Sequence, residues 1–292
     1  MYRLEQLHPL TIVFYFIAVT LPPALSMHPA LVFLSLVCSF LLPFARRDRR
    51  RAAGVLFPLL LMLLSAVLNP LFYHNGMTVL FILNDRPVTL EALRYGLTAG
   101  GMVAAALYWF SVFSRVMTGD KWMGLLGRLS PRWALLTAMA LRFVPLTAAQ
   151  AGRIHRAQQG AGLYRGENIV DRFRGAVREF SILTTWALEN GITTADSMEA
   201  RGYGSGRRSF YAPCRLTRRD GVFFALTLAL TGITLYAVSA GFLTVQFYPR
   251  TLLPPATPWG LAGCAAYGLA ALMPTLTEEG DRIRWRCLTS GI

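Results

Sequence analysis

Lysine is almost absent from this sequence. Lys121 is the single lysine among 29 basic residues, and the other basic residues are arginines. A P-loop nucleotide site needs the pattern Gly-x-x-x-x-Gly-Lys-Ser/Thr, in which the lysine reaches the terminal phosphates. Lys121 follows Gly119-Asp120 and precedes Trp122, so it does not complete that pattern. We therefore expect no P-loop ATPase in this chain.

Signatures of metal sites and of acid–base catalysis are missing as well. The four cysteines are scattered and form no Cys-x-x-Cys pair: Cys38, Cys214, Cys264 and Cys287. The four histidines form no His-Glu-x-x-His pattern. Acidic residues are few, and their densest group, Glu278-Glu279 with Asp281, is typical of a solvated tail. The sequence therefore predicts no metal site and a chain that is not an enzyme.

Long apolar runs dominate the chain. Hydrophobic residues make up 54% of it and charged residues 15%, with a mean hydropathy of +0.43, which excludes a soluble fold. A helix needs about 20 apolar residues to cross a bilayer core of about 30 Å. Runs of this kind lie at 9–26, 29–44, 52–73, 91–114, 221–243 and 257–276. We predict an all-α polytopic membrane protein with about six transmembrane helices.

The arginines predict the orientation of these helices, because positive residues accumulate on the cytoplasmic side. Five arginines lie within 46–51, 17 of the 29 basic residues lie between Arg115 and Arg219, and three more follow the last run. The segments 69–90 and 244–256 contain only Arg86 and Arg250. This distribution predicts that both termini are cytoplasmic. We interpret most of the arginines as topology signals that bind anionic lipid head groups, and expect no nucleic-acid partner.

Three regions follow from this topology. Residues 1–114 form an N-terminal membrane region of about four spans, 115–220 a cytoplasmic region, and 221–292 a C-terminal membrane region of about two spans with a cytoplasmic tail. The segment 133–151 competes for a further span, but Arg142 near its centre would cost about 2.5–3.5 kcal/mol to insert. We predict a cytoplasmic or interfacial helix there and leave a partly embedded helix open.

The apolar runs contain no acidic residue, lysine or histidine away from their ends; Glu91 and Arg94 lie at the start of the fourth. Carriers coupled to ions or protons keep ionisable residues in the bilayer, so a carrier of that class is disfavoured. The fourth run contains Gly96, Gly100 and Gly101, which predict a close approach of a neighbouring helix.

The cytoplasmic region is predicted to contain two long helices, at about 133–159 and 169–201, from apolar residues at helical spacing. The second ends in Ala200-Arg201-Gly202. Glycine is a common helix stop, and arginine suits the negative end of the helix dipole. An arginine at a helix end can also project a rigid bidentate donor into an acidic groove of another protein.

Three stretches of this region together resemble a known family. They are Leu141-Arg142-Phe143-Val144-Pro145, Ile154-His155-Arg156-Ala157-Gln158, and Ser197-Met198-Glu199-Ala200-Arg201-Gly202-Tyr203-Gly204. They resemble the cytoplasmic coupling region of the transmembrane T component of energy-coupling factor transporters, the family that includes the cobalt-transport permease subunit. The resemblance implies two long coupling helices, each ending in an Ala-Arg-Gly motif that docks into a groove of one of two cytoplasmic ATP-binding-cassette (ABC) ATPases.

The resemblance assigns the site residues. It implies that Arg201 is a docking arginine, with Ala200 and Gly202 as its small neighbours. The other motif falls on Gly160-Ala161-Gly162, where alanine stands in place of the arginine. Either Arg156 or Arg165 could replace the missing arginine if the end of the first helix were shifted.

The resemblance further implies a non-catalytic scaffold in the plasma membrane of a prokaryote. This scaffold would transmit the motion of two ABC ATPases, either a homodimer or a heterodimer, to a membrane-embedded substrate-binding S component that takes up a vitamin or a transition-metal ion. No cofactor is expected in this chain, and ATP and Mg would be bound by the ATPases. The alternative is a solute-lining permease subunit of an ordinary ABC importer, which would typically have one short coupling loop.

Overall fold

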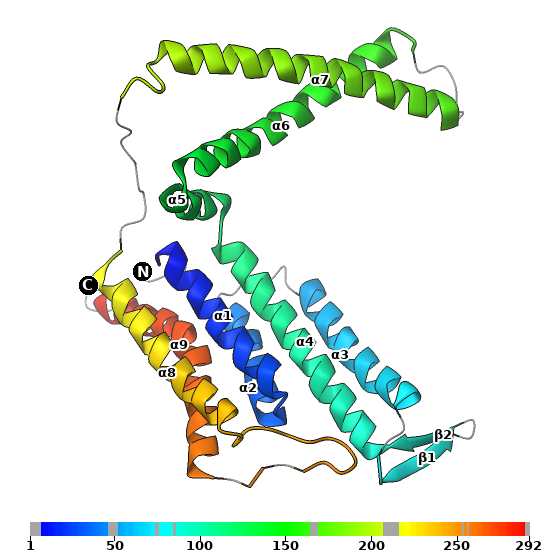
Figure 1. Cartoon of the computed structure of the whole chain (residues 1–292), viewed down its shortest axis with the longest axis vertical. Helices are drawn as coiled ribbons and strands as arrows, with labels where there is room; N and C mark the ends of the chain where they lie inside the picture. Colours follow the sequence, from blue (N-terminus) through cyan, green and yellow to red (C-terminus); the bar gives the residue numbers. More distant parts are fainter. Residues whose placement is uncertain are drawn as a thin grey trace. The chain divides into compact units, whose positions relative to one another are not determined.

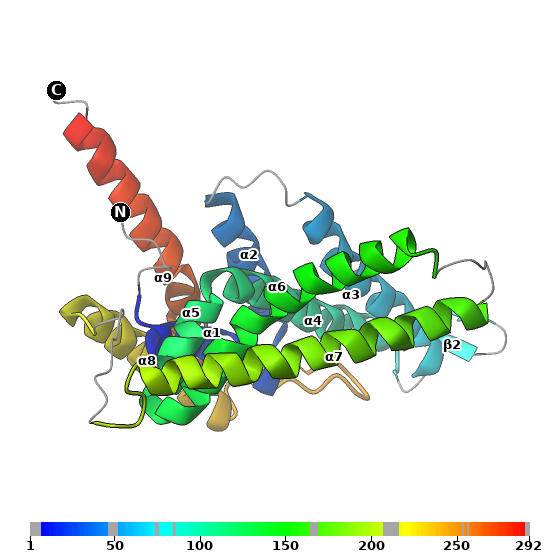
Figure 2. The same ribbon diagram turned by 90° about the horizontal axis from the view of Figure 1, so that it is seen from above.

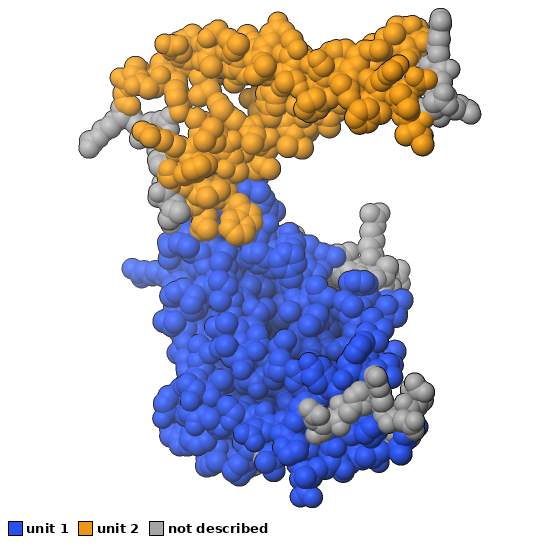
Figure 3. Space-filling view, turned by 45° about the vertical axis from the view of Figure 1, so that its right-hand side comes forward, with its two compact units in different colours: residues 1–121, 214–292 blue, residues 122–213 orange. Residues whose placement is uncertain are grey.

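The computed structural model describes residues 7–45, 52–73, 76–83, 86–163, 169–206, 216–252, 254–255 and 257–289. The described chain forms two compact units, one of residues 1–121 and 214–292 and one of residues 122–213 (Figures 1 and 3). In the first unit lie α1 (Pro9–Ser26), α2 (Pro29–Ala45), α3 (Ala52–Phe72), β1 (Val79–Leu83), β2 (Arg86–Thr89), α4 (Leu90–Val116), α8 (Arg218–Ser239) and α9 (Pro258–Thr289). The second contains α6 (Pro131–Gly160) and α7 (Ile169–Ala200), and α5 (Gly119–Leu129) begins just before it.

Each of the six predicted runs is a helix of the first unit, which confirms the all-α fold. Helix α1 has the predicted bounds and continues through Pro22 and Pro23. It ends where Met27 adopts a left-handed backbone conformation (φ 47°) and donates its amide to the Pro23 carbonyl. The first two helices thus form a tight hairpin. Helix α9 continues well beyond the predicted apolar run (Figure 2), because charged residues outside a bilayer do not end a helix.

Helix α8 begins three residues earlier than predicted because of its cap. The Thr217 hydroxyl accepts the Asp220 amide, and the Asp220 carboxylate accepts the Thr217 amide at 2.9 Å, which completes a capping box. The same carboxylate accepts the amide of His8, just before α1, at 3.3 Å. Both Asp220 and His8 are buried. One acidic residue therefore joins the start of α1 to the start of α8.

Length and composition support several membrane crossings. Among the described residues, five helices are long and apolar enough to span a bilayer: 9–26, 90–116, 132–160, 218–239 and 258–277. The segments 29–42 and 56–72 are shorter apolar helices. Four of these seven segments overlap predicted spans over most of their length, and the two shorter ones match predicted spans in part. The remaining segment is α6, which contains the segment 133–151 that the sequence analysis considered as a possible further span.

The short β-hairpin was not predicted. Strands β1 and β2 pair antiparallel in the segment 69–90, which the sequence analysis treated as a connection. Glu91, at the start of α4, is buried, and its carboxylate accepts the Thr78 hydroxyl at 2.8 Å and the Thr78 amide at 3.3 Å. These bonds tie the beginning of the hairpin to α4 and satisfy a charge at the end of a membrane helix.

The core of the first unit surrounds α1. Tyr15 and Phe16 make edge-to-face contacts with Trp109 of α4, with ring centroids 6.2 and 6.1 Å apart. The polar tips of the buried aromatic residues are satisfied: Trp109 donates to the Ser35 hydroxyl at 3.1 Å, and Tyr267 donates to the Val19 carbonyl at 2.9 Å. Since lipid offers no hydrogen-bond partner, these bonds fix which helices are neighbours.

Helix α4 packs closely against α3 through two glycines, as predicted. A Cβ added to Gly96 would lie 2.7 Å from the Ser65 carbonyl oxygen, and one added to Gly100 would lie 2.8 Å from the Met62 carbonyl oxygen. The Ser65 hydroxyl donates to the Gly96 carbonyl at 3.1 Å. Gly101 lies on another side of α4, where an added Cβ would be 3.0 Å from Val32 of α2. The three glycines therefore serve two different interfaces.

We expect Gly100→Ala to destabilise the first unit by about 1–3 kcal/mol, because the added methyl group must push the backbone of α3 away. The matched control is Gly232→Ala, since nothing lies within 4 Å of a Cβ added at Gly232 in α8. That control should be neutral or slightly stabilising. The apparent melting temperature of the detergent-solubilised protein measures both. Equal melting temperatures for the two variants would contradict the close α3–α4 packing.

Candidate functional site

The second unit is built mainly from two long helices. Helices α6 and α7 match the predicted helices at 133–159 and 169–201 within two residues at each end. Pro131 begins α6 at a position where no amide donor is needed. The two helices run in opposite directions, because Phe143 contacts Trp186 (ring centroids 5.9 Å apart) and the later residue His155 contacts the earlier residue Glu179.

The contact between α6 and α7 combines buried and polar residues. Ile154 and Gln158 of α6 and Gly175 of α7 are buried. Beside them, His155 Nδ1 lies 2.5 Å from Glu179 Oε1. Gly175 carries no side chain, so it lets the two helices approach each other. Among the described residues, the last two turns of α6 therefore pack against the first half of α7.

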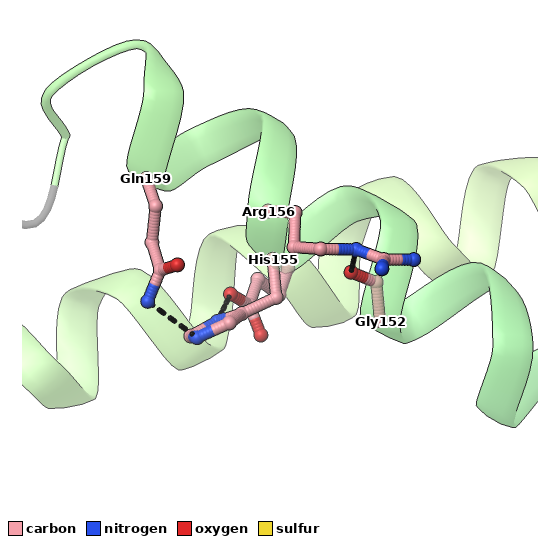
Figure 4. A network of polar contacts seen from close by, with 5 residues as sticks. Gly152, His155, Arg156 and Gln159 are labelled. Carbon is pink, nitrogen blue, oxygen red and sulfur yellow. Dashed lines mark hydrogen bonds and ion pairs between the residues drawn. The ribbon is translucent and has the colours of Figure 1, made fainter.

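Figure 4 shows the polar network at this contact, with His155 and Gln159 side by side and Arg156 extending back toward Gly152. Gln159 Nε2 lies 3.0 Å from His155 Nε2, so both ring nitrogens of the histidine have a partner. Arg156 Nε donates back along its own helix to the Gly152 carbonyl at 3.1 Å. The guanidinium group of Arg156 is therefore held one turn before its Cα, away from the end of α6.

Helix α7 ends in a Schellman motif. Arg201 is the first residue beyond the helix, and Gly202 has a φ of 81°. The Gly202 amide donates to the Glu199 carbonyl at 2.8 Å, and the Tyr203 amide donates to the Met198 carbonyl at 3.0 Å. This pair of bonds defines the motif and satisfies two carbonyl groups at the helix end. Arg201 is exposed, so its side chain projects from a rigid turn.

Helix α6 ends in the same motif. Ala161 is the first residue beyond the helix, and Gly162 has a φ of 71°. The Gly162 amide donates to the Gln159 carbonyl at 3.0 Å, and the Leu163 amide donates to the Gln158 carbonyl at 3.1 Å. The bonds connect the same relative positions as those at the end of α7.

Ala161 thus occupies at the end of α6 the position that Arg201 occupies at the end of α7. Gly160 and Ala200 are the last helical residues before them. The helix end is not shifted toward Arg156, and Arg165 lies outside the described residues. The turns at 160–162 and 200–202 therefore have the same backbone geometry. Among the side chains that differ between the two ends, Arg201 in place of Ala161 is the change that the sequence singled out.

Arg201 lies at the edge of a groove of about 1250 Å³ within the second unit. The groove runs between the first half of α6 and the second half of α7. Much of its lining is apolar, including Leu135, Met139, Phe143, Leu146 and Met198. Arg142, which the sequence singled out as a charge in an apolar segment, also lines this groove. Its charge therefore faces an open groove.

An exposed apolar stripe on α7 was missed by the sequence analysis. Phe173 and Phe180 are 69% and 71% exposed, and the same face carries Val177, Leu188 and Ile192. These residues recur at spacings of three, four and eight, which is the signal that could have found them. So large an exposed apolar surface is typical of a surface that binds a protein or a membrane.

Comparison with known proteins identifies the family. Residues 3–211 match the model of the CbiQ family, described as cobalt transport protein. The chain belongs to the CbiQ family. This match confirms the resemblance that the coupling-region residues carry, and with the apolar helices it makes this CbiQ-family chain a multi-pass membrane protein. The match includes the ends of both α6 and α7.

Several relatives bear the name energy-coupling factor transporter transmembrane protein EcfT. The one from Lacticaseibacillus paracasei is 38% identical over 104 residues, which are 35% of this chain and 39% of the relative. EcfT 1 from Listeria monocytogenes is 36% identical over 80 residues (26% and 30%), and EcfT from Heliobacterium modesticaldum is 28% identical over 154 residues (47% and 57%). The chain thus matches less than two thirds of the length of these curated relatives.

We expect Gly202→Ala to loosen the end of α7. For a residue with a Cβ, the left-handed backbone conformation that Gly202 adopts costs about 1–2 kcal/mol of free energy. The amides of Gly202 and Tyr203 should therefore exchange with solvent roughly five- to thirtyfold faster, as measured by hydrogen–deuterium exchange. Gly206→Ala is the matched control, because Gly206 is not left-handed and nothing lies within 4 Å of its added Cβ. Unchanged exchange in Gly202→Ala would contradict the Schellman end.

Proposed function

We propose that this CbiQ-family chain is the membrane coupling subunit of an energy-coupling-factor importer. Two ABC ATPases dock on the ends of α6 and α7, and a separate membrane-embedded S component binds the cargo, which is a vitamin or a transition-metal ion. The observation that carries the proposal is the family match across both helix ends, together with the matching turns that end those helices. The names of the EcfT relatives support the same role.

The geometry of the second unit suits the transmission of motion. A helix of 32 residues is about 48 Å long at 1.5 Å per residue, so a small rotation about its contact with another helix moves its end by several ångströms. The Phe143–Trp186 and His155–Glu179 contacts join α7 to α6 at residues well before Arg201 along α7. An ATPase that pulls on Arg201 therefore displaces α6 as well, because the two helices are held together there.

The chemistry of Arg201 suits docking on another protein. Its guanidinium group is always charged and presents a planar fork of donors that matches a carboxylate. The hydrogen bonds of the turn already fix the backbone that carries it, so binding has to order only the side chain. ATP and Mg are bound by the partner ATPases in this proposal, and this chain contributes no group to hydrolysis.

We also propose the orientation. The first unit lies in the plasma membrane of a prokaryote, and both termini and residues 115–220 are cytoplasmic. Helix α6 meets the length and hydropathy of a span, but Arg142 would be a costly charge at its centre, and a crossing there would move later arginines outside. This leaves α1, α2, α3, α4, α8 and α9 as the membrane helices.

The docking role of Arg201 is tested by co-purification. Tagged wild-type protein from native membranes should retain ABC ATPases, and Arg201→Ala should retain about 10- to 100-fold less of at least one, because a charge-assisted bidentate contact contributes about 1.5–3 kcal/mol. The matched control is Arg174→Ala, an equally exposed arginine on α7. Full retention by Arg201→Ala, with uptake intact, would show that Arg201 is not the docking residue.

Labelling of single introduced cysteines in intact cells tests the orientation. A membrane-impermeant maleimide should modify Arg250→Cys, in the connection between α8 and α9, above the wild-type background. Ser205→Cys, in the turn after α7, should react only after the membrane is permeabilised. Reaction of Ser205→Cys in intact cells would place the second unit outside the cell.

A further inference from the structure

The turns that end α6 and α7 have the same backbone shape, and they differ in the charge of their side chains. The turns after α6 and α7 have the same two hydrogen bonds, with lengths within 0.2 Å, and a glycine with a left-handed φ at the same position. Ala161 and Arg201 are both exposed at the position before that glycine. A partner that meets either turn therefore finds the same backbone. The side chains distinguish the two ends: Arg201 stands in place of Ala161, Glu199 in place of Gln159 and Tyr203 in place of Leu163.

The end of α6 has no cation within its described turn. Gly160, Ala161, Gly162 and Leu163 are uncharged, and the side chain of Arg156 points back along its helix to the Gly152 carbonyl. The carbonyl end of a helix carries a partial charge of about −0.5. This end is therefore weakly negative and apolar, with Leu163 half exposed beside it. An acidic groove is a poor match for such a surface.

From this difference we infer that the two ATPases are different chains, and that the one docked on α6 has a groove without a carboxylate at the position that meets Ala161. The inference rests on the proposed function. In a homodimer both grooves would be identical, so the carboxylate that pairs with Arg201 in one copy would face Ala161 in the other. A charge left unpaired in a closed interface is strongly unfavourable, and a heterodimer avoids it.

The experiment uses the tagged full-length protein from its native membranes, with mass spectrometry to identify and quantify every co-purifying chain that contains a P-loop. Wild type should retain two different ATPases in equal amounts. Arg201→Ala should lower the retention of one of them about 10- to 100-fold more than that of the other. Ala161→Arg should lower the retention of the other one, because the guanidinium group enters a groove that cannot pair with it.

Ala161→Gln is the matched control, since glutamine adds a long side chain without charge. The backbone of Ala161 (φ −76°, ψ 0°) accepts any of these residues, so the variants should fold. Glutamine should weaken retention less than arginine, and an equal loss in both variants would overturn the argument from charge. One ATPase chain in two copies, or stronger retention by Ala161→Arg, would overturn the inference.

Two further outcomes separate this inference from the proposed function. Release of the second ATPase by Arg165→Ala would mean that a cation beyond the turn binds this ATPase at the α6 end. That result would overturn the inference of a groove without a carboxylate, and it would leave the proposed coupling role intact. A wild-type protein that retains no ATPase, under conditions where its membrane helices stay folded, would contradict the proposed function itself.

Discussion

The free-energy cost of a charge in hydrocarbon governs this structure. The membrane helices of the first unit have their few charged residues at their ends, where Glu91 accepts hydrogen bonds from Thr78 and Asp220 caps α8. Each carboxylate also joins two segments, so a residue that the bilayer excludes from the span becomes a link between helices. Because of the same cost, most arginines lie in the connections and in the second unit. Their positions, in a chain with a net charge of +14, indicate which segments stay out of lipid.

Inside the bilayer, the helices are held together by packing and hydrogen bonds, because lipid is as apolar as the side chains. Gly96 and Gly100 bring α4 against the backbone of α3, and Trp109 and Tyr267 donate to groups on neighbouring helices. Specific contacts therefore set the arrangement around α1. This is why a methyl group added at one of these glycines should matter more than a change of the same size at Phe72 or Leu63, whose side chains are mostly exposed.

The second unit follows a different rule. Its described residues form two long helices that contact each other along part of their length, an open groove, and a stripe of exposed apolar side chains on α7. The described part of this unit buries few of its apolar side chains, and its exposed apolar surface is available to the partner proteins that we propose. Its two helix ends have the same backbone turn but different side chains, so Ala161 and Arg201 can distinguish the two partners that we propose. A non-catalytic role is consistent with this design, since the distinctive features lie on surfaces and helix ends.

The sequence by itself determined the positions of the long helices and the glycine stop at Gly202, because apolar periodicity and helix capping depend on residues close together in the chain. The correspondence between 160–162 and 200–202 came from the family resemblance of the coupling region. The sequence did not reveal the β-hairpin, because strand pairing depends on register between segments. Nor did it reveal the contact of His155 with Glu179 or the groove beside Arg142 and Arg201. Those features are decided by which faces of α6 and α7 meet, and that choice depends on packing between residues far apart in the sequence, such as Ile154 and Gly175.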